Sequence, residues 1–311
     1  MKYISLTTAF TPLLLLITLL NSPNGISKEL AITFDDSPRA AKGLLSGPER
    51  ANKLVAALAK HQVKQVAFFS VSKHLNTEGI TRLNTYSDAG HLIANHSHDH
   101  PDFNTSSLTQ YINNFLQADK QLKQFSTFTK MYRFPYLREG NTPEKRDGMR
   151  ATLDKFGYKN AYITLNTYDW YIENLFQAAL AKGKEVNLER MKRFYVEVMI
   201  ESIEYYDTLA IQYLNRSPKH VLLLHEMDIS ALFIGDLIDE LRRRDWSIIS
   251  PEQAYNDEIS QMVTKKVLSY NPGRIGEIAR DKGQKKQLWH KSLDETYLTE
   301  KFNKDVLLLK K

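Results

Sequence analysis

The chain has 311 residues, of which 42% are hydrophobic and 11% aromatic, so it can bury a substantial core in one large domain or two modest ones. Its formal net charge is +6, but no arginine-rich helix and no zinc-finger spacing accompanies that charge, and we expect no nucleic-acid partner. The chain contains no cysteine, which excludes cysteine nucleophiles, thiolate metal sites and disulfides.

The N-terminus is typical of an exported protein. Lys2 is followed by an apolar run over residues 10–20, which has the length of the hydrophobic region of a signal peptide and is short for a membrane span. We therefore expect a signal peptide over residues 1–27 and a periplasmic or secreted protein with no membrane span in the mature chain. The alternative is an uncleaved N-terminal anchor.

Strands and helices are expected to alternate along the rest of the chain. Short apolar runs predict strands at residues 30–34, 65–71, 91–95, 131–134, 160–165, 220–224 and 246–249. Helical spacing and capping residues predict helices that begin near residues 47, 77, 105, 142 and 251, with one more over 231–244. This alternation predicts an α/β fold with a parallel sheet surrounded by helices, and the length fits a single (β/α) barrel.

Two segments stand apart from this pattern. Residues 171–214 read as a long helical insertion whose apolar stripe is expected to be core. Residues 258–311 are dense in Lys and Arg and carry only scattered apolar residues, among them Trp289. We therefore expect a main domain over residues 28–257 and a basic helical extension over 258–311 that packs on it.

Polar clusters follow directly after several predicted strands. Asp35 and Asp36 end the first strand, and two adjacent buried carboxylates require a metal ion or an arginine beside them. Histidines follow the third strand, and His225 ends a later one. Because active sites lie at the carboxyl ends of the strands in such folds, we expect these clusters to meet there.

The histidines suggest a metal site. His96 and His100 are four residues apart, and in a helical turn both rings would lie on one face, with Asp36 as the third ligand. Two imidazoles and one carboxylate suit a single divalent ion, with zinc as the first choice. His98 would share a face with both in an extended backbone, but Asp99 and Pro101 favour a turn. The remaining histidines have no such neighbours and are expected to be structural: His61, His74, His91, His220 and His290.

Five motifs together resemble the polysaccharide deacetylase (NodB-like) family, carbohydrate esterase family 4. They are Thr33-Phe34-Asp35-Asp36, His96-Ser97-x-x-His100, Arg133-Phe134-Pro135-Tyr136, Asp169-Trp170 and Leu223-x-His225, in the order and approximate spacing of that family. The resemblance covers roughly residues 30–255. The insertion and the extension depart from the family's pattern.

The resemblance implies a distorted (β/α) barrel and a metal-dependent hydrolase that removes N-acetyl groups from an N-acetylhexosamine poly- or oligosaccharide. It also implies a role for each motif residue: Asp36, His96 and His100 as metal ligands; Asp35 as general base beside a bidentate Arg133; His225 as general acid oriented by Asp169; Tyr136 as oxyanion donor through its backbone N–H and as substrate contact; Trp170 and Leu223 as the substrate pocket. Two alternatives stay open. The same site could cleave another amide, a cyclic imide or an O-acetyl ester, with the insertion roofing the cleft, or the chain could be a sugar-binding protein without activity.

Overall fold

A computed structural model describes residues 28–268 and 270–309 of the chain. The expected signal peptide, and the anchor that is its alternative, lie outside these residues. Over the part of the chain that is described, no helix is both long and apolar enough to cross a membrane.

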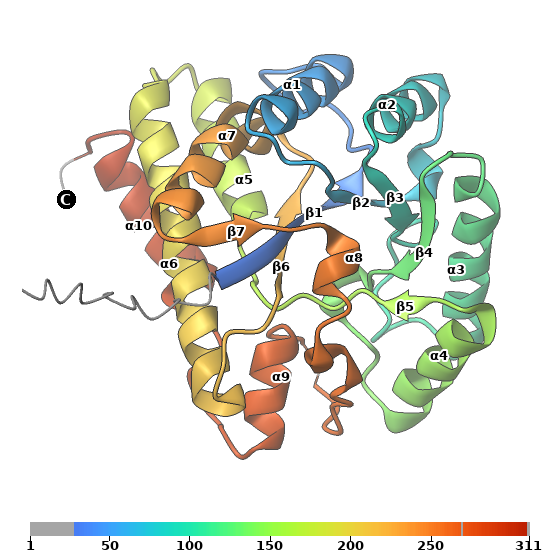
Figure 1. Cartoon of the computed structure of the whole chain (residues 1–311). Helices are drawn as coiled ribbons and strands as arrows, with labels where there is room; N and C mark the ends of the chain where they lie inside the picture. The colour runs from blue at the N-terminus through green and yellow to red at the C-terminus, as the bar shows by residue number, and fades with distance from the viewer. Residues whose placement is uncertain (1–27, 269, 310–311) are drawn as a thin grey trace, which may run out of the picture.

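One curled parallel sheet forms the centre of the molecule (Figure 1). Among the described residues its strands are β1 (Lys28–Ser37), β2 (Ala67–Ser70), β3 (Leu92–Asn95), β4 (Phe128–Tyr132), β5 (Lys159–Asn160), β6 (His220–His225) and β7 (Trp246–Ile248). They lie in the order β5-β4-β3-β2-β1-β6, and β7 also pairs with β1. All seven predicted strands therefore exist, and every pairing is parallel, as the alternation with helices predicts.

The two ends of this strand order are joined by residues 161–165, which we call the seam. The amide N–H groups of Thr164 and Leu165 donate to the carbonyl of Val221, and Leu223 N–H donates to the carbonyl of Leu165. Leu165 thereby forms a parallel bridge with Leu222 of β6. The strand predicted over 160–165 is thus regular only at its start, because the chain must leave β4 to reach β6. The result is the distorted (β/α) barrel that we expected.

Helices cover the outside of the sheet (Figure 1). In the described part of the chain they are α1 (Gly47–Lys60), α2 (Thr77–Asp88), α3 (Leu108–Leu122), α4 (Pro143–Phe156), α5 (Asp169–Ala181), α6 (Leu188–Leu214), α7 (Asp228–Arg243), α8 (Pro251–Ala254), α9 (Arg274–Asp281) and α10 (Glu295–Asp305). Side-chain caps fix several starts: Ser46 and Glu49 form a reciprocal capping box at α1. Ser107 does the same with Gln110, so α3 begins three residues later than predicted.

The insertion consists of two helices, α5 and α6, and the break between them contains Gly183 at φ 67°. The apolar residues on one face of α6 that were predicted to be core are buried, except Tyr205, which is half-buried. The helix packs against α7, α9 and α10.

The extension rests on the barrel and on the insertion. Arg274 N–H donates to the carbonyl of Ile163 in the seam at 2.7 Å, and its guanidinium lies 4.6 Å from the Tyr162 ring centroid. At the other end, the hydroxyls of Tyr171 and Thr299 are 2.9 Å apart and link α10 to α5. The extension therefore shares contacts with both neighbours, and the boundary at residue 257 stays a prediction.

Candidate active site

The carboxyl ends of β1, β3, β4 and β6 meet at one mouth of the barrel. The register of β1 and β6 places Asp35 beside His225, although 190 residues separate them in the chain. His96 follows β3, and Arg133 follows its neighbour β4, where Arg133 N–H donates to the carbonyl of Asn95 at 3.0 Å. Parallel pairing alone thus brings four of the expected site residues together.

Asp36, His96 and His100 form one compact cluster. Oδ1 of Asp36 lies 3.6 Å from Nε2 of His96 and 3.4 Å from Nε2 of His100. The three ligand atoms all lie within 4.8 Å of one another. The helical turn expected between the histidines is wrong: Ser97 and His100 have φ values of 73° and 58°. An irregular loop brings the rings together, held by a 3.0 Å hydrogen bond from His100 N–H to Ser97 Oγ.

Outer contacts orient two of these three donors, His96 and Asp36. Nδ1 of His96 lies 2.8 Å from the carbonyl of Arg133, so Nδ1 carries the proton and Nε2 keeps its lone pair. Oδ2 of Asp36 accepts from Arg39 at 3.2 Å, which leaves Oδ1 for the histidines. Tetrahedral zinc with bonds of about 2.0–2.1 Å sets its ligand atoms about 3.4 Å apart. The donor set therefore fits a divalent ion without large movement.

The protonation states of the cluster also suit a metal. Burial lowers the pKa of His96 and of His100 to about 4, so both rings are neutral at neutral pH. Burial opposes ionisation of Asp36, but its basic neighbours His225 and Arg39 contribute to a pKa well below the usual range. Neutral imidazoles and an ionised carboxylate are the forms that bind metals.

Asp35 is buried next to the cluster and pairs with Arg133. Burial raises the pKa of Asp35 to about 6, against the opposing effect of the arginine. Nη1 of Arg133 contacts both carboxylate oxygens, at 2.9 and 3.1 Å. The expected bidentate clamp therefore uses a single nitrogen, because Nε donates to the carbonyl of Ala161 and Nη2 donates to Thr33 and Tyr255.

His225 pairs with Asp169, which begins α5. Nδ1 of His225 lies 2.7 Å from one oxygen of Asp169, and the backbone N–H of His225 donates to the other oxygen at 2.7 Å. Burial disfavours the charged ring, but the charge and hydrogen bond of Asp169 outweigh it and raise the pKa of His225 to about 9. A protonated His225 with Nδ1 engaged presents Nε2–H as a proton donor.

The site opens into a cavity of about 690 Å³. Tyr136, Trp170 and Leu223 all line it, as the resemblance implies. Tyr136 has φ 55° and a side chain 56% exposed, and its ring centroid lies 4.5 Å from that of His100. No residue from 171–214 contributes to the lining, so the insertion does not roof this cavity.

His98 does not join the cluster. Its Nδ1 lies 2.9 Å from Ser72 Oγ and 3.2 Å from Gln121 Oε1, on the outer side of the loop. The histidines expected to be structural do not line the cavity either: His61, His74, His91, His220 and His290. His220, for example, is fully buried, with its Nε2 3.2 Å from Asp207.

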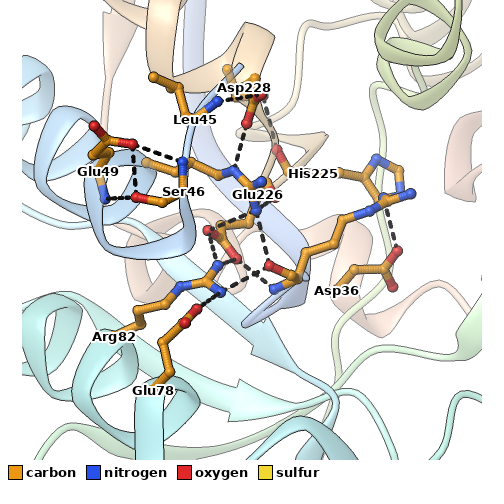
Figure 2. A network of polar contacts seen from close by, with 12 residues as sticks. Asp36, Leu45, Ser46, Glu49, Glu78, Arg82, His225, Glu226 and Asp228 are labelled. Atoms are coloured by element: carbon orange, nitrogen blue, oxygen red, sulfur yellow. Dashed lines mark hydrogen bonds and ion pairs between the residues drawn. The ribbon is translucent and has the colours of Figure 1, made fainter. Parts of the chain in front are cut away.

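Sequence reasoning missed a buried ion-pair network behind the site (Figure 2). Glu226, next to His225, is fully buried, and its two carboxylate oxygens accept from Nη2 of Arg82 at 2.5 and 2.6 Å. It also accepts from the Tyr86 hydroxyl at 3.0 Å and from Arg39 N–H at 2.7 Å. Glu226 thus anchors the backbone of the arginine that contacts Asp36. The sequence feature that could have indicated this network is an acidic residue directly after a predicted buried strand.

Asp228, which is labelled in Figure 2, extends this network through Arg50. Nε of Arg50 donates to Oδ1 of Asp228 at 2.9 Å, and Leu45 N–H donates to Oδ2 at 3.0 Å. Nη1 of Arg50 also lies 3.6 Å from Glu226. These bonds tie α1 and the loop before it to the start of α7, which follows β6.

This fold and site define a class: a parallel (β/α) barrel with an aspartate and two histidines at the mouth, flanked by an Asp–Arg pair and an Asp–His pair. Residues 23–161 match the family model described as polysaccharide deacetylase. This match bears out the resemblance over that region, which is somewhat less than half of the chain. The match contains the first three motifs, and Asp169 and His225 lie beyond it.

Solved structures share the fold. A carbohydrate esterase family 4 pseudoenzyme from Bacillus anthracis is 16% identical, with a TM-score of 0.51 over 74% of this chain and 66% of that chain. A mutant of it with restored enzymatic activity is 17% identical, with a TM-score of 0.52 over 74% and 68%. A mutant of the peptidoglycan deacetylase PdaC from Bacillus subtilis is 17% identical, with a TM-score of 0.50 over 74% and 90%. Comparison with curated proteins gave no match. At these identities the likeness establishes the fold.

Proposed function

We propose that this chain is a metal-dependent deacetylase that hydrolyses the N-acetyl group of an N-acetylhexosamine poly- or oligosaccharide. The observation that carries the proposal is the cluster of Asp36, His96 and His100, whose ligand atoms lie within 4.8 Å of one another. The match of residues 23–161 to the polysaccharide deacetylase model supports the same reaction class and a glycan substrate.

Asp36, His96 and His100 would hold one divalent ion, with zinc as the first choice. When bound, such an ion lowers the pKa of water and polarises a carbonyl oxygen. The chain's own residues arrange the rest of the reaction. Arg39 keeps one oxygen of Asp36 occupied, and the Arg133 carbonyl keeps the His96 ring in one tautomer.

Asp35 is placed to take the proton from the attacking water. Its carboxylate lies 3.7 Å from His96 Nε2, close to the cluster without belonging to it. Arg133 holds the carboxylate in place and favours its ionised form. Water then adds to the acetyl carbonyl, and the negative charge that develops on oxygen is met by the backbone N–H of Tyr136.

His225 is placed to complete the hydrolysis. As the bond from carbon to nitrogen breaks, the Nε2 proton of His225 passes to the leaving amine, and acetate is released. Asp169 fixes the ring so that this nitrogen faces the cavity. Leu223, two residues earlier on the same strand, lies on the same face and would contact the acetyl methyl, with Trp170 beside it.

The proposal is tested by acetate release from chitin oligomers, peptidoglycan fragments and acetylated xylan. Release from an N-acetylated glycan should be abolished by a chelator, restored by added zinc and lost in Asp35→Asn. Activity that survives full metal removal would refute the mechanism. Release from xylan alone would favour the O-acetyl ester alternative, and binding of a glycan without any release would favour a sugar-binding protein.

We also propose that the protein is exported after cleavage of residues 1–27, and that residues 28–257 form the catalytic domain. The apolar run at residues 10–20 supports export. N-terminal sequencing of the protein recovered from its native host checks both points. A mature chain that begins at Met1 would contradict the cleavage.

A further inference from the structure

The extension after the barrel contributes to the cavity of the candidate site. Tyr270, Asn271, Trp289 and Leu293 line the same cavity as the metal cluster and His225. None of these four residues belongs to the five motifs, and all lie beyond residue 257. The cleft is therefore completed by a segment that the family model does not match.

Trp289 is exposed on a backbone that is firmly held. Its side chain is 43% exposed, whereas Leu288 beside it is 5% exposed and belongs to the core. Tyr205 of α6 donates its hydroxyl to the carbonyl of Gln287, and its ring centroid lies 5.2 Å from that of His290. Contacts on both sides thus hold the segment that carries the indole.

Tyr270 stands next to this indole. Its side chain is 41% exposed, and the two ring centroids are 5.0 Å apart with an edge-to-face angle of 87°. Asn271 accepts from Gly273 N–H at 2.7 Å and donates to Glu277 at 2.9 Å, which anchors the chain directly after the tyrosine. The pair presents a preformed aromatic wall, which we name the 270/289 wall.

Such a wall suits one kind of occupant in this cleft. Large aromatic side chains left exposed in a cavity gain free energy when an apolar face covers them. The C–H face of a pyranose ring is apolar while its hydroxyl rim is polar, and the lining of this cavity also includes the polar residues Arg39, Arg138 and Asn166. A sugar ring satisfies both kinds of surface, which a purely apolar ligand does not.

We infer that the 270/289 wall binds a second sugar ring of the glycan, next to the ring that loses its acetyl group. The inference rests on the proposed function for the identity of the glycan. The cavity of about 690 Å³ lies within the usual range for ligand sites and is shared by the wall and Trp170, so one chain of sugars can contact both. The protein therefore selects oligomers over the monosaccharide.

The test measures binding by calorimetry in the Asp35→Asn background, in which turnover is expected to be at least about a hundredfold slower. The probes are N-acetylglucosamine, its β-1,4-linked tetramer and a peptidoglycan tetrasaccharide. At least one tetramer should bind more tightly than the monomer. Trp289→Ala should weaken that tetramer about tenfold, the factor expected for one lost aromatic stacking contact, and leave the monomer unchanged. Trp289→Phe should restore most of the loss, and Tyr270→Ala should act like Trp289→Ala.

Phe156→Ala is the matched control, because Phe156 is 36% exposed and lies outside the cavity. It should leave the binding of every probe unchanged. The inference is overturned if neither tetramer binds more tightly than the monomer, if Trp289→Ala leaves the tetramer within about twofold of its parent, or if it weakens both lengths equally. Acetate release by the unaltered chain is measured separately. Its absence would remove the proposed function and leave length-dependent binding as an independent result.

Discussion

Glu226 offers a sharp test of how the site is supported. The substitution Glu226→Gln keeps the shape of the side chain and removes its charge. In the folded protein this carboxylate is fully buried and accepts from Arg82, Tyr86 and Arg39, with Arg50 at 3.6 Å. The variant would leave the buried guanidinium of Arg82 without the carboxylate that faces it (Figure 2), and Arg50 would lose the same neighbour.

The expected loss is large. Breaking a buried ion pair by removing one partner costs about 3–5 kcal/mol, because the remaining charge stays buried. We therefore expect Glu226→Gln to lower the free energy of unfolding by about that amount and the melting temperature by roughly 6–20 °C. Urea denaturation followed by circular dichroism measures the change, and the slope of the transition should stay constant.

Glu240→Gln is the matched control on the surface. Glu240 pairs with Arg243 and Arg244 at 2.5 and 2.6 Å, but both arginines are exposed. This change should cost at most about 1 kcal/mol. Adding Arg82→Met to Glu226→Gln should recover part of the loss, because one unpaired guanidinium is then gone. A loss for Glu226→Gln no larger than that for Glu240→Gln would refute the reasoning.

Three further predictions concern the site and the pH dependence of stability. His100→Ala should abolish stoichiometric zinc binding in equilibrium dialysis, whereas His98→Ala, on the same loop but facing Gln121, should retain it; zinc binding that persists in His100→Ala would place the ion elsewhere. Asp35→Asn should lower kcat at least about a hundredfold with zinc still bound, and normal turnover would exclude Asp35 as the base. Burial lowers the pKa of His91 to about 4 from an unfolded value near 6.5. This histidine therefore does not reduce the free energy of unfolding above about pH 6.5, and it reduces it by up to about 3 kcal/mol as the pH falls towards 4. His91→Gln should flatten this acid-side slope in urea titrations, and an unchanged slope would show that His91 does not contribute.

The sequence predicted the parts of the fold that depend on local pattern. Buried parallel strands are continuous apolar runs, so all seven were found, with ends shifted by a few residues. The meeting of the site residues at one mouth could be predicted from the direction of the strands, because the carboxyl ends of parallel strands lie at the same edge of the sheet. The loop from His96 to His100 did not follow, because its conformation has positive φ at Ser97 and His100, and contacts with other segments fix it.

Other features depend on contacts between distant segments, which no local pattern reveals. Arg39 reaches Asp36 because Glu226 holds its backbone from 187 residues away. Trp289 enters the cleft because Tyr205 of α6 fixes the segment beside it. In the sequence this tryptophan is one of several scattered apolar residues, and nothing separates it from those that pack inside. Only the folded structure shows that Trp289 lines the cavity and does not pack in the core.

The contact between the extension and the seam bears on how the protein can be divided. Arg274 N–H meets the carbonyl of Ile163, and its guanidinium covers Tyr162. A fragment truncated after Asp257 would remove the donor to the Ile163 carbonyl and uncover the Tyr162 ring. Apolar surface that the extension covers would become exposed, so the fragment should precipitate or self-associate. An insoluble or inactive fragment would then reflect the missing contacts with the extension. It would carry no information about the chemistry at the mouth of the barrel.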